Sequence, residues 1–288
     1  MIRYNPKDWV AIVVHGYSSS VIKVLFPMLA FMGIFTLVLA FTLDYYDINY
    51  KSTTAIHSLM GIVLGLFLVF RTNSAYDRWW EGRKQWGALV NNTRTLAMKI
   101  NAFVDRSNLE ARDYFVKMIP NFVYATKEHL RDNFIEAEID EPKPGLIKQL
   151  KDVNHKPNKI SGMMYEKVQE LYKQGKISGD HLFLLDKELK SFLDILGACE
   201  RIKNTPIPYS YSMFIKKFIF TFTITLPFGI VTDFHYWTVP IVLLIFYILV
   251  SIELISEEIE DPFGRDLNDL PTDDLAFKIK SNINEILK

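Results

Sequence analysis

Four long segments without charged side chains restrict what this chain can fold into. They run over residues 24–43, 52–70, 218–232 and 234–252. An α-helix rises about 1.5 Å per residue, so about 20 apolar residues cross the roughly 30 Å hydrocarbon core of a bilayer. The first, second and fourth segments are long enough for this. The sequence therefore predicts an integral membrane protein with several membrane-spanning helices.

The third segment is shorter, but two features favour a span there. Lys216 and Lys217 can extend their ammonium groups to the interface, and the apolar and aromatic run that begins at Tyr209 can lengthen the helix. The alternative is that all four segments are buried helices of a soluble protein. Soluble helices usually carry a polar face, and these segments show almost none. Four transmembrane helices are therefore predicted.

Basic residues predict the orientation of the spans. They precede the first span, follow the second and precede the third: Arg3, Lys7, Lys23, Arg71, Arg78, Arg83, Lys84, Lys216 and Lys217. The loops on the opposite side hold only Asp44, Asp47, Lys51 and Asp233 as charged residues. Because cytoplasmic loops carry an excess of Lys and Arg, both termini are expected in the cytoplasm.

These spans divide the chain into four parts. Residues 1–70 hold an N-terminal segment with transmembrane helices 1 and 2, and residues 71–208 form a cytosolic helical region. Residues 209–252 hold transmembrane helices 3 and 4, and residues 253–288 form a cytosolic C-terminal segment. No helix breaker occurs between the second span and Val104, so that span should continue as one long helix. No convincing strand pattern is present, and the predicted fold class is all-α.

Further helices and one surface loop are predicted outside the membrane. The loop covers residues 136–159, where prolines and charges concentrate. The last helix is expected to have Thr272 as its N-cap. The predicted helices are 109–131, with Pro120 inside; 159–174; 178–204, capped by Ser178 or Asp180; and 272–287.

Charge, cysteine content and motifs argue against several classes of protein. The 33 basic and 33 acidic residues leave no basic excess for binding nucleic acid. The single cysteine, Cys199, cannot form an intrachain disulfide or supply the paired thiolates of a structural zinc site. Hydrolase, P-loop, zinc-protease and CxxC motifs are absent, so neither an enzyme nor a cofactor is predicted. His57, within the second span, is interpreted as an interfacial or hydrogen-bonded neutral histidine.

The second span carries a pattern with two interpretations. Gly61 and Gly65 form a GxxxG pair that permits close helix packing, and Ile62, Leu66 and Phe70 form an apolar stripe beside it. Taken alone, such a stripe is more often a packing surface than the wall of a pore, because every side of this helix is apolar. The residues by themselves leave both interpretations open.

Two segments resemble the bacterial bestrophin homologues. Residues 71–83, Arg-Thr-Asn-Ser-Ala-Tyr-Asp-Arg-Trp-Trp-Glu-Gly-Arg, are similar to a signature of that family, and residues 259–264, Ile-Glu-Asp-Pro-Phe-Gly, resemble the segment after its last span. The resemblance implies a homopentamer in the bacterial inner membrane, in contact with lipid, that conducts monovalent ions. It also implies a hydrophobic pore neck formed by Ile62, Leu66 and Phe70, and a cytosolic constriction at Ile177.

The resemblance leaves the permeant ion and the gating signal open. Animal members conduct chloride and are opened by calcium held at an acidic run, whereas bacterial members include cation conductors, which slightly favours cations here. The corresponding run keeps Asp266 and Asp269 but interrupts them with other residues. Calcium needs six to eight oxygen ligands, so we do not predict a metal site at Asp266 and Asp269. A secondary transporter and a non-conducting membrane scaffold are the alternative functions.

Overall fold

The computed structural model describes residues 19–48 and 54–288, and all regular elements within these ranges are helical. The predicted all-α fold is therefore confirmed for this part of the chain. Arg3, Lys7 and Lys51, used to predict orientation, and Ser52, where the second span was expected to begin, lie outside the described residues.

The chain divides into two compact units. Unit 1 comprises residues 1–78, 206–260 and 266–268, and unit 2 comprises residues 79–205, 261–265 and 269–288. Both units draw on segments that are distant in sequence. The boundaries expected at residues 70, 208 and 252 remain a prediction.

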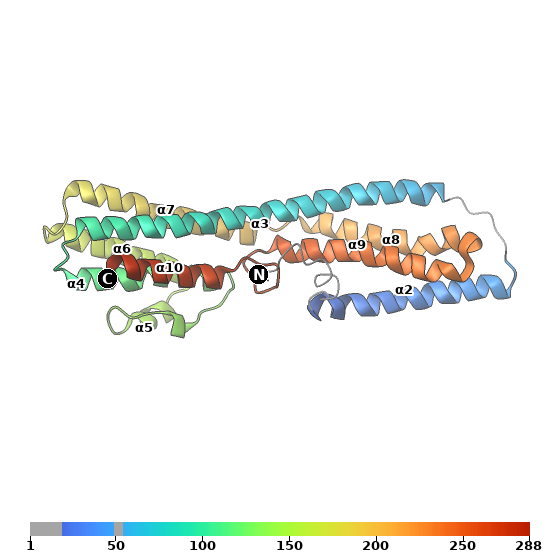
Figure 1. Ribbon diagram of the computed structural model, residues 1–288, viewed down its shortest axis with the longest axis horizontal. Helices are drawn as coiled ribbons and strands as arrows, with labels where there is room; N and C mark the ends of the chain where they lie inside the picture. Colours follow the sequence, from blue (N-terminus) through green and yellow to red (C-terminus); the bar gives the residue numbers. More distant parts are fainter. Residues whose placement is uncertain (1–18, 49–53) are drawn as a thin grey trace. The chain divides into compact units, whose positions relative to one another are not determined.

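Unit 1 contains the apolar helices. These are α2 (Ser19–Tyr45), the first part of α3 (Ala55–Phe103), α8 (Tyr209–Phe234) and α9 (Thr238–Glu260). Helix α2 packs against α9 and α8, and α8 packs against α9, so the three run side by side (Figure 1). Their shared core includes Leu64 and Leu68 of α3, Phe222 of α8 and Val242 of α9.

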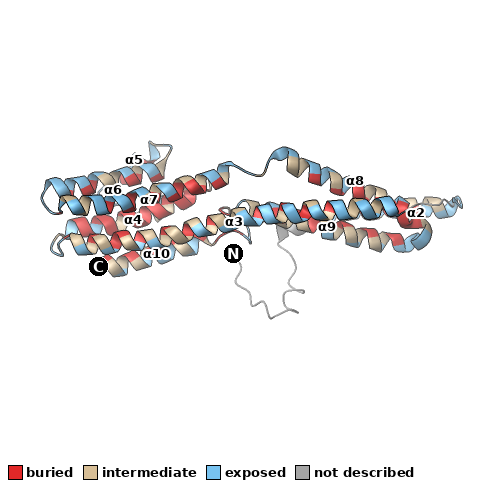
Figure 2. Cartoon of the chain, turned by 90° about the horizontal axis from the view of Figure 1, so that it is seen from above, coloured by how far each residue is buried: buried red, intermediate tan, exposed pale blue. Residues whose placement is uncertain are grey.

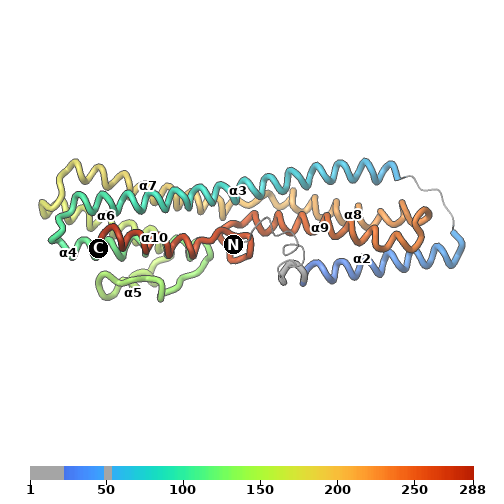
Figure 3. The backbone as a smooth tube through the Cα atoms, viewed as in Figure 1, coloured from blue at the N-terminus to red at the C-terminus, as the bar shows by residue number. Residues whose placement is uncertain are grey.

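Three helical stretches in the described residues are long and apolar enough to cross a membrane. They are Lys23–Tyr45, Ala55–Phe103 and Tyr209–Glu260. The third contains α8 and α9, and the chain reverses between them at the short helix η2 (His235–Trp237; Figure 3). The predicted extension of the third apolar segment back to Tyr209 is confirmed.

Two expected features of these helices can be compared with the structure. Helix α3 is one uninterrupted helix of 49 residues, as predicted from the absence of breakers after the second span. Proline can break a membrane helix, as the transporter alternative would require, but Pro27 and Pro227 lie inside α2 and α8. Broken helices of the kind found in transporters are therefore not formed at these two prolines.

Unit 2 is a helical bundle built on the later part of α3. Its other helices are α4 (Leu109–His129), α5 (Leu146–Lys151), α6 (Lys156–Lys173), α7 (Gly179–Asn204) and α10 (Thr272–Leu287). Helix α4 packs against α10 and α6, and α6 packs against α7. The core contains the fully buried Trp86, Phe115, Phe122, Phe192 and Ile279.

Two predictions in unit 2 were wrong in detail. The expected loop at residues 136–159 contains the short helix η1 (Glu136–Glu138) and α5, and α6 begins at Lys156 after the N-cap His155. Buried Leu146 and Leu150 explain α5, because they anchor it to the core. Thr272 is not the cap of α10, since its hydroxyl accepts a hydrogen bond from Arg131 instead.

The predicted cap of α7 is confirmed. The Ser178 side chain accepts a hydrogen bond from the backbone N–H of His181. This bond satisfies one of the amide groups that a helix leaves unpaired at its N-terminus.

Candidate functional site

The part of α3 that belongs to unit 1 has two faces. Ile62, Leu66 and Phe70 are 72%, 56% and 55% exposed, whereas Leu64 and Leu68 are buried. Residues two positions apart on a helix point about 200° apart, so the three exposed side chains lie opposite the buried pair. Figure 2 shows the exposed residues in pale blue along this helix.

The exposed face of α3 is broad and apolar. Besides Ile62, Leu66 and Phe70, its exposed large side chains are Ile56, Leu59, Val63 and Val69. Among residues 19–48 and 54–288, Ile62, Leu66 and Phe70 therefore do not pack into a core. Such a surface is covered by lipid or a second chain, or it faces a pore.

The two glycines of the GxxxG pair differ in their surroundings. A side-chain carbon added at Gly61 would meet the ring of Phe222 at 3.6 Å, which is ordinary contact distance. A carbon added at Gly65 would have no neighbour within 4 Å. Within one chain, the pair therefore does not form a tight backbone contact, and Gly65 is free to receive another helix.

A buried ionic cluster follows directly after the stripe. Arg71 is almost completely buried, with Nη2 2.6 Å from Glu260 Oε2 and Nε 3.5 Å from Glu253 Oε2. On the next residue, the Thr72 hydroxyl lies 3.0 Å from that of Ser256. These contacts hold α3 against the C-terminal end of α9. They fix the rotation of α3 about its own axis at the residues that follow Phe70.

Ile177 lies in the short turn between α6 and α7. Its side chain is only 5% exposed and belongs to the core of unit 2. From its place in a short Gly-bounded turn outside the membrane, the sequence predicts that truncating this residue perturbs packing little, and this prediction is wrong. Gly175, two residues earlier, has φ 68°, a backbone conformation that glycine adopts readily and that lets the chain turn here. A role for Ile177 in a constriction remains a prediction.

His57 is hydrogen-bonded, as the sequence analysis anticipated. Its Nε2 lies 3.2 Å from the hydroxyl of Thr225 in α8. The same ring approaches Gly229, where an added side-chain carbon would lie 3.0 Å from Nδ1. His57 therefore connects α3 to α8, and we assign it a structural role in the packing of these two helices.

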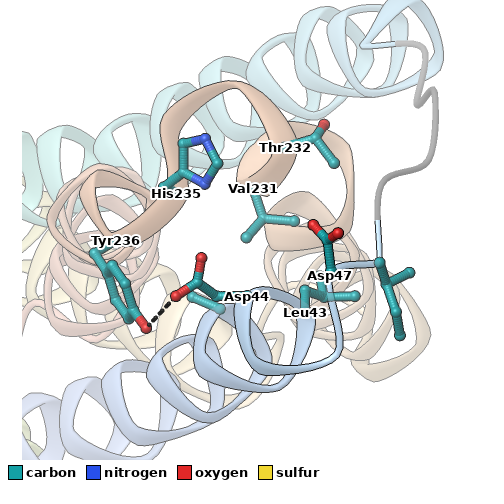
Figure 4. Close-up of a pocket in the computed structure, with 9 residues that line it drawn as sticks. Leu43, Asp44, Asp47, Val231, Thr232, His235 and Tyr236 are labelled. Carbon is teal, nitrogen blue, oxygen red and sulfur yellow. Dashed lines mark hydrogen bonds between the residues drawn. The ribbon is translucent and has the colours of Figure 1, made fainter.

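A small polar pocket of about 130 Å³ lies in unit 1 where α2 ends and η2 begins. Asp44 from the last turn of α2, Asp47 from the turn after it and His235 from η2 line it. The Tyr236 hydroxyl donates a hydrogen bond to Asp44 Oδ2 at 3.1 Å (Figure 4). This bond joins the C-terminal end of α2 to the turn between α8 and α9.

Asp266 and Asp269 have different environments. Asp266 is exposed, whereas Asp269 is buried. Within the described ranges, the groups of side chains close enough to share a metal ion include neither residue; they are His129, His155 and Glu200, and Glu128, Glu138 and Asp273. The second group already surrounds the ammonium group of Lys127, at 3.1, 2.6 and 2.7 Å.

Comparison with known proteins places the chain in a family. The model for bacterial and fungal bestrophin proteins matches residues 1–285. The chain belongs to the bestrophin family. The resemblance seen in residues 71–83 and 259–264 is thereby confirmed over nearly the whole chain.

Named relatives and solved structures agree with this assignment. The chain is 40% identical over 233 residues to the voltage-dependent anion channel-forming protein alr2987 of Nostoc sp., covering 78% of this chain and 75% of the relative. It is 32% identical to the voltage-dependent anion channel-forming protein YneE of Escherichia coli K12, covering 98% and 93%. A crystal structure of a bacterial bestrophin homologue from Klebsiella pneumoniae matches with a TM-score of 0.83 and 28% identity, covering 92% and 98%.

The structure adds functional candidates that the sequence did not reveal. The sequence shows Arg71 as a positive charge beside the second span and as the first residue of the segment 71–83. Its burial between two carboxylates depends on α9, which is distant in the chain. His129, His155 and Glu200 come from three helices, and no local motif joins them. Only a prediction of how α4, α6 and α7 pack could have found this cluster.

Proposed function

We propose that this bestrophin is a pentameric ion channel in which five copies of α3 surround the pore. Ile62, Leu66 and Phe70 would then form three apolar rings, which act as the neck. The observation that supports this proposal most is the exposure of these three side chains opposite the buried face of the same helix. The names of its relatives as channel-forming proteins support the same function.

An apolar neck can act as a gate without any moving lid. A constriction only a few ångströms wide between hydrocarbon side chains tends to lose its water, and an ion must then shed hydration to pass. A small change in width shifts the neck between dry and wet states. Since the rings carry no charge, they cannot strongly select the sign of the ion, so selectivity must arise from partial dehydration and from charges elsewhere along the pore.

The proposal includes four transmembrane helices, α2, the first part of α3, α8 and α9, in the bacterial inner membrane with both termini in the cytoplasm. The remaining surface of the exposed α3 face would contact lipid or the neighbouring subunits. Gly65 would admit the adjacent chain, because no side chain of its own chain occupies that space.

The sign of the permeant ion is the part of the proposal on which the two lines of support differ. The resemblance to bacterial bestrophins slightly favours cations, whereas the names of the curated relatives describe anion channels. The uncharged neck fits either one. The reversal potential under a salt gradient distinguishes them, because its sign follows the more permeant ion.

Recording from purified protein in a planar lipid bilayer tests the channel function. Unitary currents are expected. Coupled flux without unitary currents would instead identify a secondary transporter, and silence from correctly assembled protein would identify a scaffold. Native mass spectrometry of the detergent-solubilised protein should give the mass of five chains. A monomer or dimer under mild conditions would contradict the pentamer.

A further inference from the structure

Two histidines and a glutamate from three different helices meet in unit 2. His129 is the last residue of α4, His155 is the N-cap of α6, and Glu200 lies in α7. Nε2 of each histidine lies 2.7 Å from the same oxygen, Glu200 Oε1. The centroids of the two imidazole rings are 4.4 Å apart. The three possible ligand atoms therefore converge on one point.

We propose that this cluster is a binding site for a divalent transition-metal ion of the zinc class. The ligands would be Nε2 of His129, Nε2 of His155 and one carboxylate oxygen of Glu200. Ligands at about 2.0–2.1 Å from a tetrahedral zinc ion are roughly 3.3 Å from one another. The two 2.7 Å contacts thus need to open by roughly 0.6 Å, which small rotations of the side chains provide.

The position of the cluster favours entry of an ion from solvent. The side chains of His129, His155 and Glu200 are 29%, 33% and 27% exposed. Each side chain is therefore partly buried but still in contact with water. Three protein ligands leave a fourth position of a tetrahedral zinc ion for a water molecule.

The ligand types determine the class of metal. Calcium and magnesium are bound almost entirely by oxygen, whereas imidazole nitrogen suits zinc, copper, iron and nickel. Lys203 Nζ lies 3.5 Å from the backbone oxygen of His129 and is paired with Asp132 at 2.6 Å. Glu200 therefore remains available as the anionic ligand.

His155 makes a hydrogen bond that binding would have to break. The backbone N–H of Asn158 donates to His155 Nδ1 at 3.3 Å, which places the proton of the neutral ring on Nε2. For Nε2 to bind a metal, that proton must leave and Nδ1 must carry one instead. The cap bond is then lost. Metal binding should consequently shift the amide resonance of Asn158.

A bound ion would join the end of α4, the start of α6 and the C-terminal part of α7. None of these residues belongs to the exposed face of α3. Binding should therefore stabilise unit 2 by linkage, because the ion binds the folded arrangement and not the separated helices. This effect is measurable whether or not the protein conducts ions.

Calorimetric titration of ZnCl₂ into the full-length, EDTA-treated protein in detergent tests the site. Wild type should bind one zinc ion per chain and unfold at a higher temperature with zinc, whereas MgCl₂ and CaCl₂ should do neither. Removing an outer hydrogen-bond partner of a metal site lowers metal affinity by about 10- to 100-fold. His129→Gln and Glu200→Gln each remove a direct ligand, so each should weaken zinc binding by more than that.

Two further variants distinguish loss of the zinc site from loss of folding. His155→Asn removes the imidazole but supplies a favourable N-cap, so it should fold normally and lose zinc affinity. His181→Gln removes a histidine of α7 whose ring stacks on Phe103, away from the cluster, and should bind zinc as wild type does. Absence of saturable zinc binding in wild type, or unchanged binding in folded His129→Gln and His155→Asn, would overturn the proposal.

Discussion

Arg71 Nη2 lies 2.6 Å from Glu260 Oε2, one residue after the last side chain of the proposed neck. Arg71 is buried in α3, and the second carboxylate beside it, Glu253, is buried in α9. Arg78, two turns further along α3, donates from Nε to the backbone oxygen of Glu260 at 3.1 Å. The rotation of α3, and hence the direction in which Phe70 points, is therefore fixed by contacts with the end of α9.

Replacing Arg71 with methionine should destabilise the protein strongly. Methionine has a similar length but leaves Glu253 and Glu260 without their cation, and breaking a buried ion pair costs about 3 to 5 kcal/mol. The double variant Arg71→Met/Glu260→Gln should recover part of this loss, because one charge is removed from the cluster. The side-chain oxygen of the new glutamine can still accept the hydrogen bond from the Ile207 N–H. Thermal unfolding of the four proteins of this double-mutant cycle measures the coupling.

Lys84→Met provides the matched control for Arg71→Met. Lys84 also lies on α3 and pairs with Glu81 at 2.6 Å, but both side chains are exposed. Exposed pairs contribute less than about 1 kcal/mol, so this variant should unfold close to the wild-type temperature. An equal loss in both variants would show that the Arg71 cluster contributes no more than a surface pair.

Asp273 should make the stability of the protein depend on acid pH. The Arg131 guanidinium, which donates to this carboxylate at 2.8 Å, and the Lys127 ammonium at 2.7 Å hold the pKa of Asp273 well below its usual range. A lowered pKa in the folded state adds stability above the ordinary pKa of about 4, and this contribution is lost as pH falls toward the folded value.

Comparing Asp273→Asn with wild type across pH isolates this effect. The variant should unfold at a lower temperature near neutral pH, and the difference should shrink as pH falls below about 4. Asp113→Asn is the control, since Asp113 is exposed and pairs with the half-buried Lys117 one turn further along α4. A difference for Asp273→Asn that stays constant with pH would contradict the assigned ionic role.

The sequence predicted the helices well because their signals are local. The apolar runs, the unbroken stretch of α3 and the Ser178 cap each depend on neighbouring residues. Which side of α3 is covered could not be predicted, because Leu64 and Leu66 are equally apolar and only packing against α8 and α9 separates them. The burial of Ile177 and Arg71 could not be predicted for the same reason, because it depends on segments that are distant in sequence.

Ile177→Ala should destabilise unit 2, contrary to the expectation from the sequence. The side chain is buried in the core, and removing such an aliphatic group costs about 2 to 5 kcal/mol. Its neighbour Lys176 is exposed, so Lys176→Ala should stay within about 0.5 kcal/mol of wild type. Conductance is then compared in assembled protein. Wild-type stability of Ile177→Ala would show that the turn is looser than described.

The neck itself can be tested by truncating the two faces of α3 separately. Changing Ile62, Leu66 and Phe70 together to alanine should leave each chain folded, because these side chains contribute little to its core, and should raise conductance or open probability, because a wider bore stays wet. Changing Leu64 and Leu68 to alanine removes similar volume from the buried face, at about 2 to 5 kcal/mol for each, and should lower folded yield without new current. Single-channel recording with size-exclusion analysis separates the two outcomes. If the triple variant assembles normally yet keeps wild-type conductance and gating, the exposed face of α3 does not line the pore.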